Sequence, residues 1–291
     1  ANQYNAGFDL SLKGGKINVI VDVYQKNTND LLYTKPVPAT TGRTSETTNV
    51  GSMQNRGVDF GLNTYATIGK VKWNSQFNIA FNKNKLTSLL GDDLIAIGDN
   101  RALKVGEDIG IFYLFKMEGI YQYDGEVPNP QYNTGVRAGD VKWRDVDENG
   151  IINDNDRVLM GSSNPDFSGG WGNTFIYKNF HLDIFATYMY GNDVYAQWKQ
   201  TSLARIGDYT GSLADIVSKR WTGPGSTNKY PRAVNGSARS GFSTQNSDRF
   251  LEDGSFFRIR TITLSYIVPT PMAQRLKMKS LRVYCQADNV L

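Results

Sequence analysis

The sequence GDVKWRDVDENGIINDNDRVLMGSSNPDFSGGWGNTFIYKNFHLDIFATYMY, residues 139–190, places an acidic loop directly before two segments in which apolar and polar residues alternate. The part from Asp145 to Asp156 carries side-chain oxygens at loop positions one, three, five, nine and twelve. Gly150 stands at position six, where a calcium-binding loop turns sharply around its ion. This spacing predicts a site for a hard cation.

The predicted calcium ligands are three carboxylates, one amide and one backbone carbonyl, contributed by Asp145, Asp147, Asp156, Asn149 and Ile151. The flanking residues do not have the pattern of EF-hand helices, because an Asn164-Pro165-Asp166 turn and two glycines follow the loop. We therefore predict a lone loop in a β protein, with a structural ion. The alternative is an acidic turn that is stabilised by its own Asx-type hydrogen bonds without an ion.

Alternation with period two runs through most of the chain and predicts strands with one apolar and one polar face. In residues 71–82, Val71, Trp73, Phe77 and Ile79 alternate with polar side chains. The other predicted strands span residues 8–13, 16–26, 55–67, 111–123, 171–178, 182–190, 256–267 and 279–289. We predict about nine or ten strands in all.

The strand at residues 256–267 has a mixed phase. Arg258 and Arg260 share the parity of Ile262 and Leu264. We interpret this as one strand that runs from an aqueous region into an apolar one. A β-bulge is the alternative.

The connections between these strands are either very short or very long. Residues 13–16 and 68–70 predict tight turns, whereas residues 84–110, 124–164 and 191–254 predict long loops, the last with short helices. Short turns at one end and long loops at the other are typical of outer-membrane barrels. We therefore predict an all-β fold, a transmembrane antiparallel β-barrel with long extracellular loops. A soluble β-sandwich has the same alternation and is the alternative.

Composition narrows the function classes. The net charge is +4 and the basic residues are interspersed with acidic ones, so the sequence gives no support to nucleic-acid binding. No apolar run approaches the roughly 18 to 20 residues of a membrane helix. Cys285 is the single cysteine and is interpreted as a packing residue of a strand.

Catalytic motifs are absent from the sequence, and we predict that the protein is not an enzyme. His181 is the single histidine and lies within a predicted strand, and neither a GxSxG nor an HExxH motif occurs. A glycosidase pair of carboxylates cannot be assigned from sequence, since it is defined by a distance. Aromatic residues in the long loops are weak candidates for substrate or partner contacts, and these are Tyr195, Trp198, Tyr209 and Trp221.

Several motifs in order resemble the SusC/RagA family of TonB-dependent outer-membrane transporters. The acidic loop and its Asn164-Pro165-Asp166-Phe167 turn are the first, and Tyr190-Gly191-Asn192-Asp193 is the second. Residues 49–60 and 73–85 look like consecutive barrel strands of that family, and residues 249–269 and 280–289 look like its C-terminal strands. The resemblance covers nearly the whole chain.

The resemblance implies a barrel of about 22 strands in the bacterial outer membrane, which imports bulky nutrients such as oligosaccharides or peptides. It also implies energy from the TonB complex, contact with outer-membrane lipid, and a SusD-like surface lipoprotein as partner. Residues 1–291 correspond to the C-terminal part of such a barrel, without the N-terminal plug domain, so we expect a piece of a longer polypeptide. The alternative function is a secreted or surface-exposed β-protein that binds carbohydrate without transport.

Overall fold

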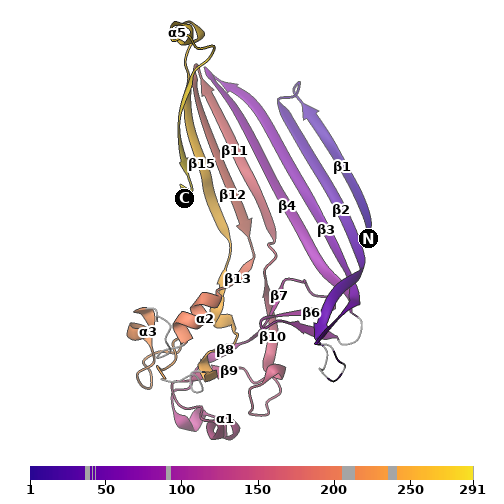
Figure 1. The fold of residues 1–291 in the computed structure, drawn as a ribbon, viewed down its shortest axis with the longest axis vertical. Helices are drawn as coiled ribbons and strands as arrows, with labels where there is room; N and C mark the ends of the chain where they lie inside the picture. The colour runs from indigo at the N-terminus through magenta and orange to yellow at the C-terminus, as the bar shows by residue number, and fades with distance from the viewer. Residues whose placement is uncertain are drawn as a thin grey trace.

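Eight strands form one antiparallel sheet, the main sheet, in the order β1-β2-β3-β4-β11-β12-β15-β16 (Figure 1). The computed structural model describes residues 1–36, 40, 42, 44–89, 93–204, 214–234 and 241–290. The strands of the main sheet are β1 (Asn2–Leu12), β2 (Ile17–Pro36), β3 (Ser45–Ile68), β4 (Val71–Leu89), β11 (Phe167–Tyr177), β12 (Phe180–Tyr190), β15 (Phe256–Ile267) and β16 (Arg282–Asp288).

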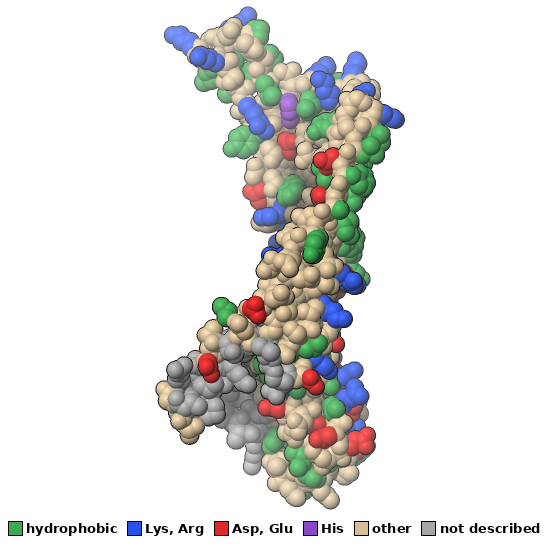
Figure 2. All heavy atoms as spheres, turned by 90° about the vertical axis from the view of Figure 1, so that its right-hand side faces the viewer, with side chains coloured by type: hydrophobic (Ala, Val, Ile, Leu, Met, Phe, Trp, Pro, Cys, Tyr) green, Lys and Arg blue, Asp and Glu red, His purple; other side chains and the backbone are tan. Residues whose placement is uncertain are grey.

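The register of the main sheet brings most of the apolar residues of its strands to one face. Phe8 lies opposite Val21, Val21 opposite Phe60, and Phe60 opposite Ile79. Directly opposed residues share a face. This apolar face comprises Phe8, Leu10, Val19, Val21, Phe60, Leu62, Phe77, Ile79, Trp171, Phe175, Leu182, Ile184, Leu264 and Tyr266. Figure 2 views the sheet from its β1 side, and hydrophobic side chains follow one margin of it.

The opposite face of the main sheet is polar. Asn74 lies opposite Thr174, Thr174 opposite Asp183, and Asp183 opposite Thr263. The hydroxyl of Thr174 donates to Asp183 Oδ1 over 2.7 Å. The polar face also carries Asn18, Asn63 and Gln76, which are opposed in register across β2, β3 and β4.

Two polar side chains on the apolar face are each hydrogen-bonded by a tryptophan. Trp73 Nε1 donates to Asn173 Oδ1 over 3.0 Å, and Trp171 Nε1 donates to Ser75 Oγ over 3.0 Å. Asn173 and Ser75 are buried beneath the rings. An unpartnered polar group on an apolar surface costs free energy when water is excluded, so these pairs make the face compatible with a non-aqueous neighbour.

A β-bulge at Arg260 accounts for the mixed phase of β15. Phe185 lies opposite Thr261, but Ala186 lies opposite Ile259, so Arg260 has no opposing residue on β12. The extra residue returns Ile259 to the apolar face and leaves Arg258 opposite Thr187 on the polar one. The alternative interpretation, a β-bulge, is confirmed, whereas the passage of this single strand from an aqueous region into an apolar one stays a prediction.

The predicted strand at residues 111–123 is not part of the main sheet. It is divided at Lys116 into β7 (Ile111–Phe115) and β8 (Met117–Ile120), which belong to two smaller sheets. The main sheet therefore has eight strands among the described residues, where the sequence predicted about nine or ten. Alternation of apolar and polar residues with period two indicates that a strand has one apolar face, but it does not identify the sheet that the strand joins.

The long connections are folded into a second unit, the loop assembly, made of the described residues in 93–166 and 191–255 (Figure 1). Its four-stranded sheet has the order β10-β7-β6-β5, with β5 (Leu94–Ile97), β6 (Arg101–Lys104) and β10 (Arg157–Ser162). Two further pairs join β8 to β9 (Val141–Trp143) and β13 (Asp193–Tyr195) to β14 (Leu251–Asp253).

Helices in the loop assembly are short. They are α1 (Asn129–Thr134), α2 (Gln197–Ala204) and α3 (Ala214–Lys219), with 3-10 helices at Asp124–Glu126, Asp154–Asp156, Gly241–Ser243 and Asp248–Phe250. The last helix, α5 (Thr270–Arg275), lies between β15 and β16 at the far end of the main sheet. Within the described ranges, no helix has the length and apolar character needed to cross a bilayer.

The packed core lies in the loop assembly. Phe115, Ile120, Val141 and Trp143 form one buried cluster, against which Trp221 packs. By contrast, the apolar face of the main sheet leaves large side chains such as Phe8 and Leu264 exposed. The main sheet thus exposes its apolar residues, whereas the loop assembly buries its own.

Gly169 of β11 provides a test of the packing on the apolar face. A Cβ at this position would lie 2.1 Å from the carbonyl oxygen of Asn78 and 2.5 Å from Tyr188 Oη. Tyr188 Oη donates to that same carbonyl over 2.7 Å. We expect Gly169→Ala to displace the ring and to lower the free energy of unfolding by about 1–3 kcal/mol.

The matched control is Gly172→Ala on the same strand, where the nearest atom would be 3.9 Å away. Thermal unfolding of the two variants and the unchanged protein measures the difference. Equal losses for Gly169→Ala and Gly172→Ala would contradict this packing.

Candidate functional site

The acidic loop runs from the end of β9 to the 3-10 helix at Asp154–Asp156. Asp156 is 0% exposed, and its carboxylate accepts hydrogen bonds from the backbone N–H groups of Val146 and Asn153, each over 2.8 Å. Asn153 in turn accepts from Asn155 N, which makes a capping box for the 3-10 helix. The buried carboxylate of Asp156 therefore links the beginning of the loop to its end.

The carboxylates of Asp145, Asp147 and Asp156 converge. One oxygen of each lies within 4.8 Å of the other two. Asp145 accepts from Asn149 N over 3.2 Å and Gly150 N over 2.6 Å, and Asp147 accepts from Asn149 Nδ2 over 2.8 Å. The donor set is all oxygen, which fits calcium, but the loop also has the internal hydrogen bonds of the alternative interpretation. Calcium binding by this loop stays a prediction.

The other two predicted ligands, Asn149 and Ile151, are hydrogen-bonded to each other. Asn149 Oδ1 accepts a hydrogen bond from Ile151 N over 2.7 Å. The side chain of Ile151 is exposed, and its backbone carbonyl is the atom predicted to bind the ion. The structure brings together the three carboxylates most clearly, and it places the amide of Asn149 beside them through its bond to Asp147.

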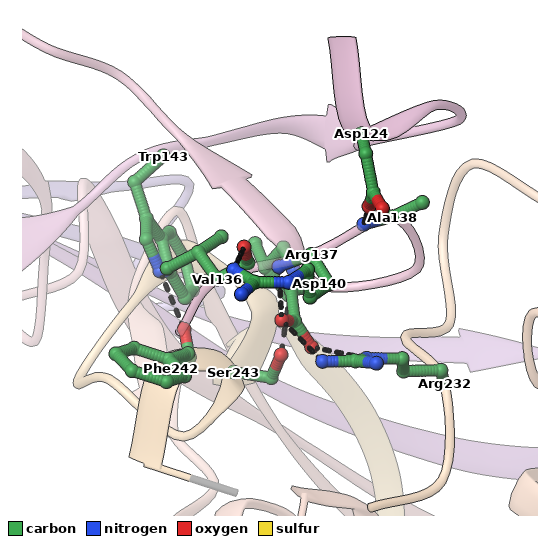
Figure 3. A network of polar contacts seen from close by, with 10 residues as sticks. Asp124, Val136, Arg137, Ala138, Asp140, Trp143, Arg232, Phe242 and Ser243 are labelled. Carbon is green, nitrogen blue, oxygen red and sulfur yellow. Dashed lines mark hydrogen bonds and ion pairs between the residues drawn. The ribbon is translucent and has the colours of Figure 1, made fainter. Parts of the chain in front are cut away.

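A buried ion pair joins two distant parts of the loop assembly (Figure 3). Arg232 Nε donates to Asp140 Oδ1 over 2.8 Å and Arg232 Nη2 donates to Asp140 Oδ2 over 2.9 Å. Asp140 is 1% exposed and also accepts from Arg137 N over 2.9 Å. Bidentate pairing of a guanidinium with a carboxylate is strong and directional. It fixes residues 137–140 against Arg232.

Further hydrogen bonds reinforce this junction. Trp143 Nε1 donates to the carbonyl of Phe242 over 2.8 Å, and Val141 N donates to Ser243 Oγ over 3.3 Å (Figure 3). Sequence reasoning did not identify the junction. Its members lie 92 to 102 residues apart, and no local pattern marks them as partners.

A polar cavity of about 560 Å³ lies beside the core of the loop assembly. Three cations and three carboxylates line it, namely Lys199, Lys229, Arg249, Glu118, Asp248 and Glu252, together with Tyr230 and Phe250. Lys199 Nζ forms an ion pair with Glu252. Such a lining can bind a ligand that carries both charges or many hydroxyl groups.

Burial perturbs two charged residues of this cavity. Burial lowers the pKa of the Arg249 guanidinium to about 10, although the neighbouring Asp248 opposes that shift. Burial also raises the pKa of Asp248, against the hydrogen bond that Asp248 Oδ1 accepts from Met117 N over 2.9 Å. Perturbed charges in a cavity are typical of functional sites.

The aromatic candidates are dispersed. Tyr195 packs between Phe112 and Phe250, with ring centroids 6.3 and 6.2 Å away, and burial raises its pKa to about 12. Trp221 packs on the core cluster and donates from Nε1 to Gln122 Oε1 over 3.2 Å. Trp198 is exposed on α2, with Lys199 Nζ 5.6 Å from its ring. Tyr209 lies outside the described residues.

The aromatic candidates differ in how accessible they are for the predicted contacts with a substrate or partner. Tyr195 and Trp221 pin loop segments to the core, which is the common role of such residues. Trp198 remains accessible and adjoins the polar cavity through Lys199. The predicted binding roles of the four aromatic residues stay predictions.

Arg232→Met tests the buried ion pair. The variant removes two charge-assisted hydrogen bonds from a buried carboxylate, so we expect it to lower the free energy of local unfolding by about 2–3 kcal/mol. Hydrogen exchange should then accelerate in residues 120–143, 228–234 and 241–243. Lys142→Met is the control, because its pair with Glu118 is half-exposed at 3.7 Å and should contribute less than about 1 kcal/mol. Equal acceleration in both variants would contradict the assignment.

The chain is similar to known proteins in both sequence and fold. No family model matches the sequence. A TonB-dependent receptor of Formosa agariphila is 31% identical over 100% of this chain, and the TonB-dependent receptor SusC of Bacteroides thetaiotaomicron is 28% identical over 90% of it. The chain spans 30% and 25% of the lengths of these two relatives.

Solved structures show the same fold. The RagAB peptide transporter superposes with a TM-score of 0.80 at 21% identity, over 99% of this chain and 31% of that one. A second RagAB structure, in a closed state, gives a TM-score of 0.76 over the same share of this chain. The apolar face of the main sheet is therefore the lipid-facing side of a transmembrane barrel wall. The chain is homologous along its whole length to TonB-dependent receptors such as SusC, and it has the fold of the corresponding part of the RagAB transporter.

Proposed function

We propose that the protein imports bulky nutrients across the outer membrane with energy supplied through TonB. The observation that carries this proposal is the similarity to TonB-dependent receptors along the entire chain. An open sheet whose apolar face is exposed supports it, because a secreted carbohydrate-binding protein would bury that face in its core. The protein would act as a transporter and not as an enzyme.

The two ends of the main sheet suggest its orientation. At one end, strands are joined by three short turns and by the connection that contains α5, while the loop assembly occupies the other end (Figure 1). Outer-membrane barrels have short turns toward the periplasm and long loops outside. The strands β2, β3 and β4 have 20, 24 and 19 residues, more than the roughly 9–11 that cross a bilayer. We propose that their surplus length carries the loop assembly above the outer surface, with the polar face lining the lumen.

The proposed cargo is an oligosaccharide or a peptide. One structural neighbour is named a peptide transporter, and that description belongs to the neighbour. In this chain, the polar cavity has paired positive and negative side chains that suit the charged groups of a peptide. Its Tyr230 and Phe250 rings suit the faces of sugars as well. We propose a SusD-like lipoprotein as the partner that covers the loop assembly.

Uptake measurements test the proposed function and the cavity together. Cells that make the complete receptor are given fluorescent oligosaccharides or fluorescent peptides, with and without an intact TonB gene. We expect uptake that disappears without TonB. Replacement of the Lys199–Glu252 pair by two alanines leaves no unpaired charge and should lower uptake of the cargo at low concentration about fivefold, a loss of about 1 kcal/mol.

The matched control is Lys104→Ala with Glu107→Ala, which removes one exposed cation and one half-buried carboxylate elsewhere in the loop assembly. A loss confined to peptides identifies peptides as the cargo, and a loss confined to oligosaccharides identifies glycans. Unchanged uptake in cells that lack the receptor would contradict the proposed function.

We also propose that the acidic loop binds one structural calcium ion through Asp145, Asp147 and Asp156. The convergence of three carboxylate oxygens and the sharp turn at Gly150, where φ is +79°, support this proposal. The ion would tie the exposed Asp147 to the buried Asp156 and would stiffen the tip of the loop assembly. It would have no catalytic role.

Two substitutions separate an ion from an internally bonded turn. Asp147→Asn removes a charge but leaves the buried contacts of Asp156, so it should abolish stabilisation by calcium and have little effect in chelator. Asp156→Asn should destabilise the loop in both conditions by about 1.5–3 kcal/mol, because it breaks buried hydrogen bonds to a carboxylate. Thermal unfolding with calcium or with chelator measures both. A melting curve of the unchanged protein that is identical in the two conditions would refute the ion.

A further inference from the structure

The turn end of the main sheet, at which four connections lie, is uniformly cationic. These connections are residues 13–16 between β1 and β2, 69–70 between β3 and β4, 178–179 between β11 and β12, and 268–281 between β15 and β16. They and their flanking residues carry nine cations, which are Lys13, Lys16, Lys70, Lys72, Lys178, Arg275, Lys277, Lys279 and Arg282. Residues 12–17, 66–73, 176–182 and 266–282 contain no aspartate or glutamate.

This segregation is large relative to the charge of the chain. Nine cations exceed the net charge of +4, so the remainder of the chain is net acidic. All nine are exposed, and none of them forms an ion pair with a carboxylate among the residues that the structure describes. Lys and Arg side chains gather at the top of the view in Figure 2. Solvent alone does not require such a separation, because interspersed charges would serve solubility equally well.

The connection between β15 and β16 adds exposed apolar side chains to these cations. After α5, Leu276 and Met278 alternate with Arg275, Lys277 and Lys279. Leu276 is 59% exposed, Met278 47%, and Met272 within α5 56%. Segments that combine exposed apolar residues with Lys and Arg are typical of the membrane interface, where the apolar groups enter the acyl boundary and the cations remain among the headgroups.

We propose that the turn end binds the anionic phospholipid headgroups of the periplasmic leaflet, with residues 272–279 lying in the interface. The inference rests on the orientation given in the proposed function. Continuity with the lipid-facing apolar face favours lipid over an acidic protein, because Phe180 and Tyr266 of that face lie directly beside the turns. The cations also recur at all four connections across the width of the sheet, as a leaflet boundary requires, and are not gathered in one patch.

The turn end would have two effects. Attraction to anionic headgroups would fix the depth of the barrel in the membrane, and it would weaken as salt screens the charges. It would also surround the wall with a shell of anionic lipid at the periplasmic boundary.

Lipid selectivity of the complete receptor tests the proposal. The receptor is reconstituted in phosphatidylcholine bilayers with spin-labelled phosphatidylglycerol or spin-labelled phosphatidylcholine, and the motionally restricted fraction of each lipid is measured. We expect several-fold selectivity for phosphatidylglycerol at low salt, which falls in 1 M NaCl. The triple variant Arg275→Gln, Lys277→Gln and Lys279→Gln should lose at least about half of this selectivity.

The control variant carries Lys104→Gln, Lys116→Gln and Lys142→Gln, three exposed cations of the loop assembly, and should keep the selectivity of the unchanged receptor. Heat-modifiable gel migration shows independently that each variant forms its barrel. Equal restriction of the two lipids by a folded, unchanged receptor would overturn the proposal, as would equal selectivity in the two triple variants, and both results would leave the proposed import function intact. Failure of the unchanged receptor to insert at all would instead count against the proposed function.

Discussion

The structure depends on the register of backbone hydrogen bonds across the main sheet. Period two along each strand gives a two-faced element, but only correct pairing brings the apolar faces of eight strands together. A shift of one residue between β3 and β4 would place Phe77 and Ile79 on the polar side of their neighbours. The bulge at Arg260 shows the same constraint at work, because one unpaired residue keeps Ile259 on the apolar face. Register therefore determines which side of the wall contacts lipid.

The main sheet and the loop assembly place their apolar side chains in different environments. The main sheet leaves its apolar face for hydrocarbon, and two polar side chains on that face, Asn173 and Ser75, accept hydrogen bonds from Trp73 and Trp171. The loop assembly lies beyond the sheet and has its own core around Phe115 and Trp143, closed by the buried pair of Asp140 with Arg232. This core can hold the polar cavity and the acidic loop in fixed positions, as the proposed recognition of a large nutrient would require.

The sequence predicted those elements that are formed by residues close together along the chain. Long alternating stretches such as residues 71–82 and 182–190 are strands of the main sheet, and the short helices α2 and α3 lie in the long loop where they were predicted. The spacing of Asp145, Asp147 and Asp156 predicted three carboxylates that indeed converge, although their ion is untested.

Features made by distant residues were not predicted. The strand at residues 111–123 was assigned to the wrong sheet, because its partners in β10 and β9 lie about 25 to 50 residues away and have no distinctive pattern. The pairing of Asp140 with Arg232 and the charged cavity arise from segments that only the folded chain brings together. Their residues look like ordinary surface charges in the sequence.

Accessibility along β12 distinguishes a lipid-facing apolar face from one that is buried in a closed core. Spin labels are placed one at a time at residues 181–185 of the complete receptor in lipid vesicles, after Cys285→Ser removes the native thiol. Collisions with oxygen report lipid, and collisions with a water-soluble nickel complex report the lumen. A lipid-facing apolar face should give oxygen maxima at Leu182 and Ile184 and nickel maxima at His181 and Asp183. Labels at Leu182 and Ile184 that are shielded from both reagents, as in the closed core of a soluble sandwich, would contradict it.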